Sequence, residues 1–135
     1  MFNAILASLI IFQAVPPQLY NLNFNQVDSN EGVNIGFVEL VITPQNGYKW
    51  GTEYNAELKI KNNSNVILEK KYFSWKNKDF SFKGKSVVVK IPFEIKFMKD
   101  QIIRGKLSFL VCNKNHCLLQ RNIKVKFKLI SIPGC

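Results

Sequence analysis

The chain has 135 residues, of which 47% are hydrophobic, 21% charged and 13% aromatic. This composition indicates one folded domain and excludes a disordered or low-complexity chain. Nineteen Lys and Arg against nine Asp and Glu give a net charge of +10, and all nineteen basic residues follow residue 48. The asymmetry is compatible with a polyanionic partner, and equally with lysines that fill solvent-facing strand positions.

The first seventeen residues have features of an export signal. An apolar run over residues 1–15 ends in two prolines, and its length suits the hydrophobic region of a secretory signal. No Lys or Arg precedes the run, so a buried first helix or strand is the alternative. We expect a periplasmic or otherwise secreted, extracytoplasmic protein with no transmembrane span in the mature chain. The expected parts are a signal peptide at 1–17, an N-terminal extension at 18–35 and a domain at 36–135.

Period-2 alternation of apolar and polar residues predicts β-strands after residue 35. The clearest run is 122–129, where apolar residues face one way and three lysines the other. Pro92 lies inside one run and indicates an edge or a bulge there. Seven or so short strands at about ten-residue spacing predict an all-β fold, an antiparallel β-sandwich of the immunoglobulin-like type. The predicted strands cover residues 36–43, 57–61, 66–73, 86–97, 105–112 and 122–129.

Two of the three cysteines flank a predicted hairpin loop. Cys112 ends one strand and Cys117 begins the next, with four residues between them. A hairpin of this length can bring the two Cα atoms within disulfide range. Such a bridge joins no distant segments, and its place at the end of a sandwich favours a redox pair that another sulfur can approach. An inert hairpin disulfide and two reduced thiols are the alternatives.

The residues around these cysteines add charge but no metal site. Lys114 and His116 lie in the loop, and nearby positive charge lowers the pKa of a cysteine thiol. A closed zinc site would need the only histidine and all three cysteines, so we expect no metal and no cofactor. Cys135 is the odd cysteine, which either stays free or links two chains into a disulfide-bonded dimer.

The segment 107–129, with its two cysteines and alternating last strand, resembles the redox hairpin of the N-terminal periplasmic domain of the thiol:disulfide interchange protein DsbD. Residues 42–50 are similar to a Gly-Tyr segment of that family, and residues 75–85 are similar to its cap-loop region. The resemblance covers about residues 36–130. The loop between the cysteines is one residue shorter than is usual in the family, and it is basic where the family's site is acidic.

The resemblance implies an immunoglobulin-like fold and an electron-shuttle function. A thioredoxin-like donor would reduce the Cys112–Cys117 disulfide, and the dithiol would reduce an oxidised partner through a mixed disulfide. By analogy, Cys117 would engage the partner and Cys112 would resolve. The resemblance also implies aromatic side chains near the cysteines, one of which covers the disulfide until a partner docks. The implied flanking aromatics are Tyr48 and Trp50, and the implied cap is Phe80 or Phe82.

A non-catalytic binding module is the alternative function, because immunoglobulin-like sandwiches are often interaction domains. The disulfide would then be inert, and a basic strand face would meet an acidic surface. Nucleic acid is not expected as a partner, because only two of the basic residues are Arg and no aromatic–basic motif is present. Whether the chain is an enzyme, a thiol:disulfide oxidoreductase, stays open. The basic face would comprise Lys59, Lys61, Lys124, Lys126 and Lys128.

Overall fold

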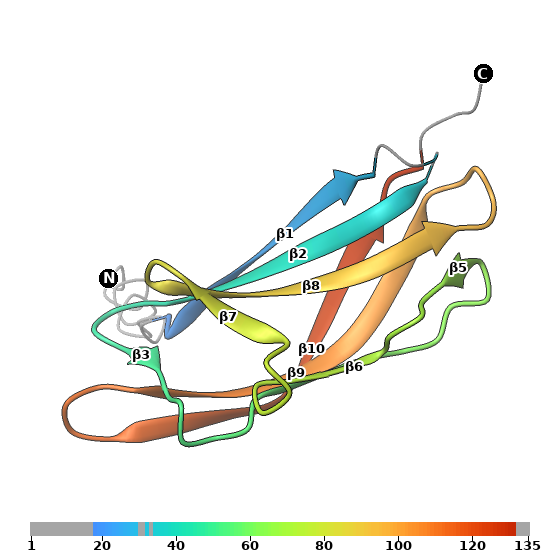
Figure 1. Ribbon diagram of the computed structural model, residues 1–135. Coiled ribbons are helices and arrows are strands. Elements are labelled where there is room, and N and C mark those ends of the chain that lie inside the picture. The colour runs from blue at the N-terminus through green and yellow to red at the C-terminus, as the bar shows by residue number, and fades with distance from the viewer. Residues whose placement is uncertain (1–17, 30–31, 33, 132–135) are drawn as a thin grey trace, which may run out of the picture.

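The computed structural model describes residues 18–29, 32 and 34–131, and over this part of the chain it contains strands and no helix (Figure 1). The predicted signal peptide and Cys135 lie outside the described residues. The strands are β1 Tyr20–Asp28, β2 Ile35–Pro44, β3 Lys49–Trp50, β4 Glu57–Ile60, β5 Val66–Ile67, β6 Tyr72–Ser74, β7 Phe80–Lys83, β8 Ser86–Ile95, β9 Gln101–Cys112 and β10 Cys117–Leu129.

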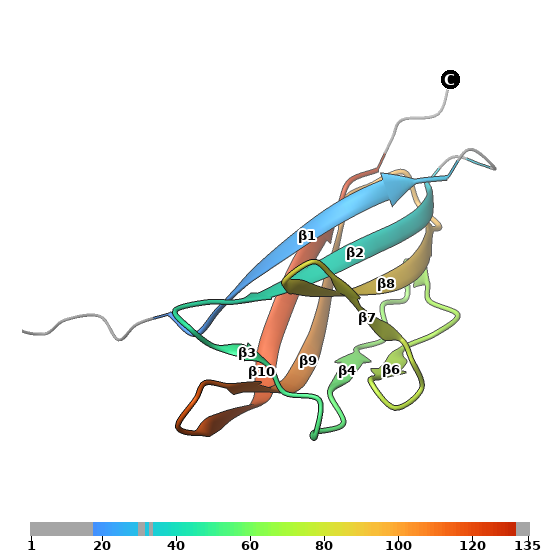
Figure 2. The ribbon, with the colours of Figure 1, turned by 60° about the vertical axis from the view of Figure 1, so that its left-hand side comes forward.

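These strands form two antiparallel sheets. The first has the order β1-β2-β8-β5, with β7 also paired to β8. The second has the order β10-β9-β4-β6, with β3 also paired to β9. Figures 1 and 2 show β1, β2 and β8 in one layer and the long β9–β10 hairpin in the other. The predicted all-β fold, with two antiparallel sheets as in a β-sandwich, is confirmed.

One apolar core lies between the two sheets. Alternate residues of β2 and β8 and of β9 and β10 are buried, so each strand places one row of side chains against the opposite layer. Aromatic contacts bridge the layers: the Tyr20 ring centroid lies 5.0 Å from that of Phe109, and Phe24 stacks on Phe127 at 4.8 Å. Each large apolar side chain buried here contributes about 1.5–3 kcal/mol.

A bulge in β10 decides which of its side chains face solvent. Gln120 and Ile123 pair with residues of β9 that are only two apart, so β10 carries one extra residue there. Asn122, in the bulge, has a φ of 54°, and its backbone N–H donates a hydrogen bond to Ser108 Oγ at 2.9 Å. Because side chains alternate along a strand, the extra residue reverses the alternation. Cys117 before the bulge and the lysines after it therefore project from the same outer face.

Three strands were not predicted from the sequence. The segment 18–35, which we expected to be an extension, contains β1, which pairs along its whole length with β2. β3 has only two residues, too few to show a period, and β7 lies in the region that the resemblance identifies as a cap loop. The predicted strand 66–73 is two short strands in different sheets, because β5 pairs with β8 and β6 pairs with β4.

Pro92 occupies a one-sided position in β8, as its presence in that run indicated. Residues 86–89 of β8 pair with β7, and residues 94–95 pair with β5. Between these two stretches, Pro92 has β2 as its only paired neighbour. Proline has no backbone N–H to donate, so it is tolerated where a strand is paired on one side only.

Side-chain hydrogen bonds join the two sheets at the end of the molecule away from the cysteines. The Gln26 amide of β1 donates to the carbonyl of Ile130 at 2.9 Å and accepts from its N–H at 2.7 Å. Asp100, ahead of β9, accepts from the N–H of Ser131 at 2.8 Å, and its carboxylate lies 3.4 Å from Lys128 Nζ. The residues that follow β10 are thus tied to both sheets.

The Asp100 carboxylate should make stability depend on pH. The backbone hydrogen bond from Ser131, and secondarily Lys128, lowers the pKa of this carboxyl below its ordinary value of 3.8. The charged form is favoured by folding, so its contribution is present above pH 3.8 and is lost as the pH falls through the lower folded-state pKa. We expect Asp100→Asn to flatten the acid limb of a plot of Tm against pH. Glu53→Gln, in an exposed turn, is the control, and equal acid limbs in both variants and the wild type would contradict this role.

Candidate functional site

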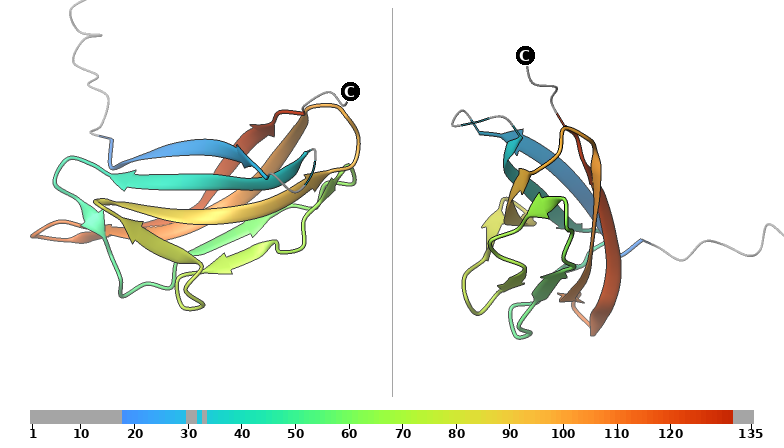
Figure 3. Two further views of the ribbon diagram at one scale, coloured as in Figure 1. Left: turned by 45° about the horizontal axis from the view of Figure 1, so that its top comes forward. Right: turned by 90° about the vertical axis from the view of Figure 1, so that its right-hand side faces the viewer.

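The two predicted cysteines form a disulfide at the closed end of the β9–β10 hairpin. They pair directly in the sheet register, with a Cα–Cα distance of 4.0 Å. The next pair outward is joined by a backbone hydrogen bond of 2.9 Å from Asn113 N–H to the His116 carbonyl. The cysteines therefore occupy a non-hydrogen-bonded position, where opposite side chains come closest in an antiparallel ladder. The hairpin end projects from one end of the molecule (Figure 3, left).

The loop between the cysteines is held by one of its own side chains. Asn113 Oδ1 accepts hydrogen bonds from the backbone N–H groups of Asn115 and His116, at 2.8 and 2.9 Å. This is the side-chain-to-backbone pattern by which asparagine fixes a turn. Lys114 is exposed at the loop. The loop can thus keep its shape without help from the disulfide.

The two sulfur atoms differ in their surroundings. Cys117 is exposed, whereas Cys112 is half-buried. Gly51 lies against Cys112, because a Cβ added to this glycine would stand 3.1 Å from the Sγ atom and 2.7 Å from Leu110 Cδ2. An incoming thiolate therefore has a more open approach to the sulfur of Cys117.

Lys49 is a neighbour of the disulfide that the sequence analysis did not single out. It pairs directly with Cys112 across β3 and β9, so the two side chains project from the same face of the sheet. Its ammonium group supplies positive charge on the side where a Cys112 thiolate would form. Both Lys49 and Gly51 adjoin Trp50, which the resemblance did mark, but only the strand register shows that they flank Cys112.

His116 lies on the other face of the hairpin. Neighbouring residues of a strand point in opposite directions, so the imidazole and the Cys117 sulfur diverge. Tyr48 is the partner of His116: the Tyr48 Oη atom lies 3.1 Å from His116 Nε2, and the ring centroids are 6.0 Å apart. This pair ties the β2–β3 turn to the hairpin loop, and it does not place His116 to take a proton directly from Cys117.

The other predicted aromatics lie on the core side of the sheets. Trp50 stacks on Phe109 at 5.5 Å and lies 5.8 Å from Phe80, which is buried. Phe82 is 57% exposed and contacts Trp75 edge-on at 5.5 Å. The disulfide projects from the opposite face of β9. The structure thus brings Trp50 and Phe80 into contact. Neither Phe80 nor Phe82 lies on the face of β9 that carries the disulfide.

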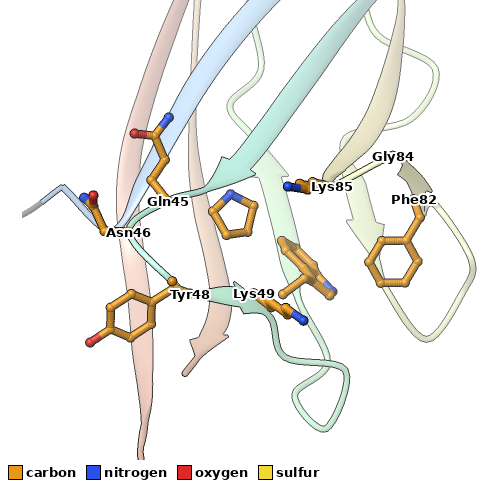
Figure 4. A pocket seen from close by; sticks show the side chains of 10 residues that line it. Gln45, Asn46, Tyr48, Lys49, Phe82, Gly84 and Lys85 are labelled. Carbon is orange, nitrogen blue, oxygen red and sulfur yellow. The ribbon is translucent and has the colours of Figure 1, made fainter. Parts of the chain in front are cut away.

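A groove of about 590 Å³ separates the β2–β3 turn from the β7–β8 hairpin. Figure 4 shows Gln45, Asn46 and Tyr48 on one side and Phe82 and Lys85 on the other. Neither Cys112 nor Cys117 lines this groove. The lining residues are Pro44, Gln45, Asn46, Gly47, Tyr48, Lys49, Trp50, Phe82, Gly84 and Lys85.

Comparisons with protein-family models, with curated proteins and with solved structures found no significant match to this chain. Among the described residues, no cluster of three or more His, Cys, Asp or Glu side chains is arranged to hold a metal ion. The same part of the chain has no helix with the length and apolar character needed to cross a membrane.

Removing the disulfide should lower the stability without unfolding the protein. The bridge closes a loop of only six residues, for which the chain-entropy relation gives about 2 kcal/mol. We expect Cys112→Ser/Cys117→Ser to keep the β-sheet circular dichroism spectrum and to lower Tm by about 5–10 °C. Unfolding of the double variant at room temperature would show instead that the bridge is a required structural link.

Proposed function

We propose that this protein performs thiol–disulfide exchange through Cys112 and Cys117. The supporting observation is an exposed disulfide that joins two residues already paired by the sheet. A bridge in this position stabilises no contact between distant segments, so its location is better explained by access than by stability. The resemblance of the hairpin to the DsbD domain points to the same chemistry.

The exposures of the two sulfurs suggest an order of events. A donor thiolate attacks Cys117 Sγ, a donor–Cys117 disulfide forms, and Cys112 leaves as a thiolate beside Lys49. The second thiol of the donor then attacks the donor sulfur that is bonded to Cys117. A disulfide forms within the donor, and Cys117 is released as a thiolate. The donor is oxidised to a disulfide, while the two cysteines gain two electrons and two protons. In the reverse direction, the dithiol reduces an oxidised partner through the same Cys117 intermediate.

The proposal extends to the fold type, the partners, the compartment and the cap. Two facing antiparallel sheets are compatible with an immunoglobulin-like sandwich. The donors and acceptors are thioredoxin-like proteins with vicinal cysteines, and the compartment lies outside the cytoplasm, where disulfides persist. A cap formed by Phe82, the exposed candidate, would require the β7–β8 hairpin to move round to the disulfide face. Phe80 is less suited to a cap, because its ring would have to leave the core.

The reduction potential of the pair decides between exchange and an inert bridge. We expect the full-length Cys135→Ser protein, equilibrated with glutathione buffers, to titrate between about −120 and −270 mV. The substitution removes the third thiol, so only the Cys112–Cys117 pair titrates. A value well below about −300 mV would identify a structural disulfide, and the binding-module alternative would then replace the exchange function.

Single-cysteine variants test the order of attack. In a Cys135→Ser background, Cys112→Ser leaves Cys117 as the free thiol, and Cys117→Ser leaves Cys112. We expect Cys117 to react with 5,5′-dithiobis(2-nitrobenzoate) faster than Cys112, by on the order of fivefold at a fixed thiolate fraction, because Gly51 covers one side of Cys112. Measuring each rate against pH separates thiol pKa from access. Equal pH-independent rates would remove the steric argument for Cys117 as the entry point.

A further inference from the structure

Six cationic side chains form a regular array on the outer face of the second sheet. Lys59 of β4 pairs with Lys106 of β9, and Lys106 pairs with Lys124 of β10. In the next row, the N–H of Lys61 donates to the carbonyl of Arg104 at 2.8 Å, and Arg104 pairs with Lys126. We call these six residues the cation lattice; they are Lys59, Lys61, Arg104, Lys106, Lys124 and Lys126.

The cation lattice is a concentration of positive charge on one face of the sheet. All six side chains are exposed, and none of them takes part in the ion pairs found among the described residues. Two acids on this face have other partners, because Glu57, two residues from Lys59, accepts from the Tyr72 hydroxyl and Asp100 faces Lys128. Like charges directly opposite each other destabilise a strand pair. An anionic partner would remove this repulsion.

The lattice surrounds a hollow that anionic groups can enter. An open depression of about 400 Å³ is lined by five of the six cations, together with Gly105 and Val125. Gly105 lies between the two rows, and a Cβ there would stand 2.6 Å from the carbonyl oxygen of Lys59. The glycine thus permits the close approach of β4 and β9 that places Lys59 beside Lys106 and Lys61 beside Arg104.

We infer that the cation lattice docks this protein on an anionic lipid bilayer. Three strands side by side make a broad sheet face, and clusters of four to eight basic residues are the usual means of attraction to anionic headgroups. Five of the six residues are lysines, which are flexible, hydrated point charges. Ile102, 39% exposed and next to Arg104 on the same face of β9, adds apolar surface at the lattice margin.

The same face fits nucleic-acid binding less well than lipid binding. Single-stranded nucleic acids are held by charged grooves with aromatic side chains that stack on bases. The aromatic side chain at the lattice is Tyr72, which pairs with Lys59 and donates its hydroxyl hydrogen to Glu57. A face of three paired strands is also too broad for the major groove of DNA, which admits a helix or a two-stranded ribbon.

Co-sedimentation of the oxidised full-length protein with vesicles tests the proposal. We expect binding to vesicles containing about one third phosphatidylglycerol, weak or no binding to pure phosphatidylcholine, and release as salt increases. Arg104→Gln/Lys106→Gln/Lys124→Gln removes three lattice charges. Each basic residue near an anionic surface changes the partition coefficient about fivefold, so the triple variant should bind about 100-fold less.

A matched variant separates the lattice from total charge. Lys76→Gln/Lys96→Gln/Lys99→Gln removes the same three charges from exposed loop positions outside the lattice, and it should bind within a few-fold of wild type. Equal losses in both triple variants would overturn the lattice as the site. Displacement of the protein from vesicles by duplex DNA or heparin at equal anionic charge would overturn the bilayer as the partner. Thermal melts complete the test: the lattice variant should melt no lower than wild type, since it loses like-charge pairs.

Discussion

The bulge in β10 is the constraint on which both surface features of this protein depend. One extra residue between Gln120 and Ile123 reverses the alternation of side chains along the strand. In the part of β10 that follows the bulge, Val125, Phe127 and Leu129 are buried in the core, and the lysines between them face solvent. Ahead of it, Cys117 faces the same side as those lysines. With regular pairing throughout, Cys117 and the lysines of β10 would have to project from opposite faces.

The bulge is supported by contacts of its own. Asn122 adopts a positive φ, which asparagine tolerates better than most residues. Its N–H donates to Ser108 Oγ. Ser108 lies on β9 between Lys106 of the cation lattice and the half-buried Leu110. The point where the alternation reverses therefore separates the charged part of the outer face from the disulfide end.

The alternation of residues predicted the long strands because each has one buried face. It did not predict β1, although Tyr20, Leu22 and Phe24 alternate with asparagines, because asparagine is a poor strand former and lowers the local signal. The segment 66–73 alternates as well, yet β5 and β6 belong to different sheets. A local period indicates that a face is buried, but it carries no information about the sheet against which it is buried.

In the candidate site as well, contacts between residues close in sequence were predicted and contacts between distant residues were not. The spacing of Cys112 and Cys117 was enough to predict their pairing, since a short hairpin fixes its own register. The neighbours of the disulfide, Lys49 in β3 and Gly51 directly after it, lie more than sixty positions earlier, and only the pairing of β3 with β9 identifies them. The resemblance directed attention to the aromatics of the same segment, which alternate with Lys49 and so face the core.

The disulfide and the cation lattice share one face, which links the two proposals physically. A protein docked through the lattice would hold the outer face of β9 and β10 on the C-terminal side of the bulge toward an anionic surface. Lys49, which pairs with Cys112, would then add positive charge beside the disulfide. An acidic partner surface would be attracted to the same region, and long-range attraction raises the rate of encounter more than the final affinity. A redox partner held at the same surface would meet the exposed sulfur by diffusion in two dimensions.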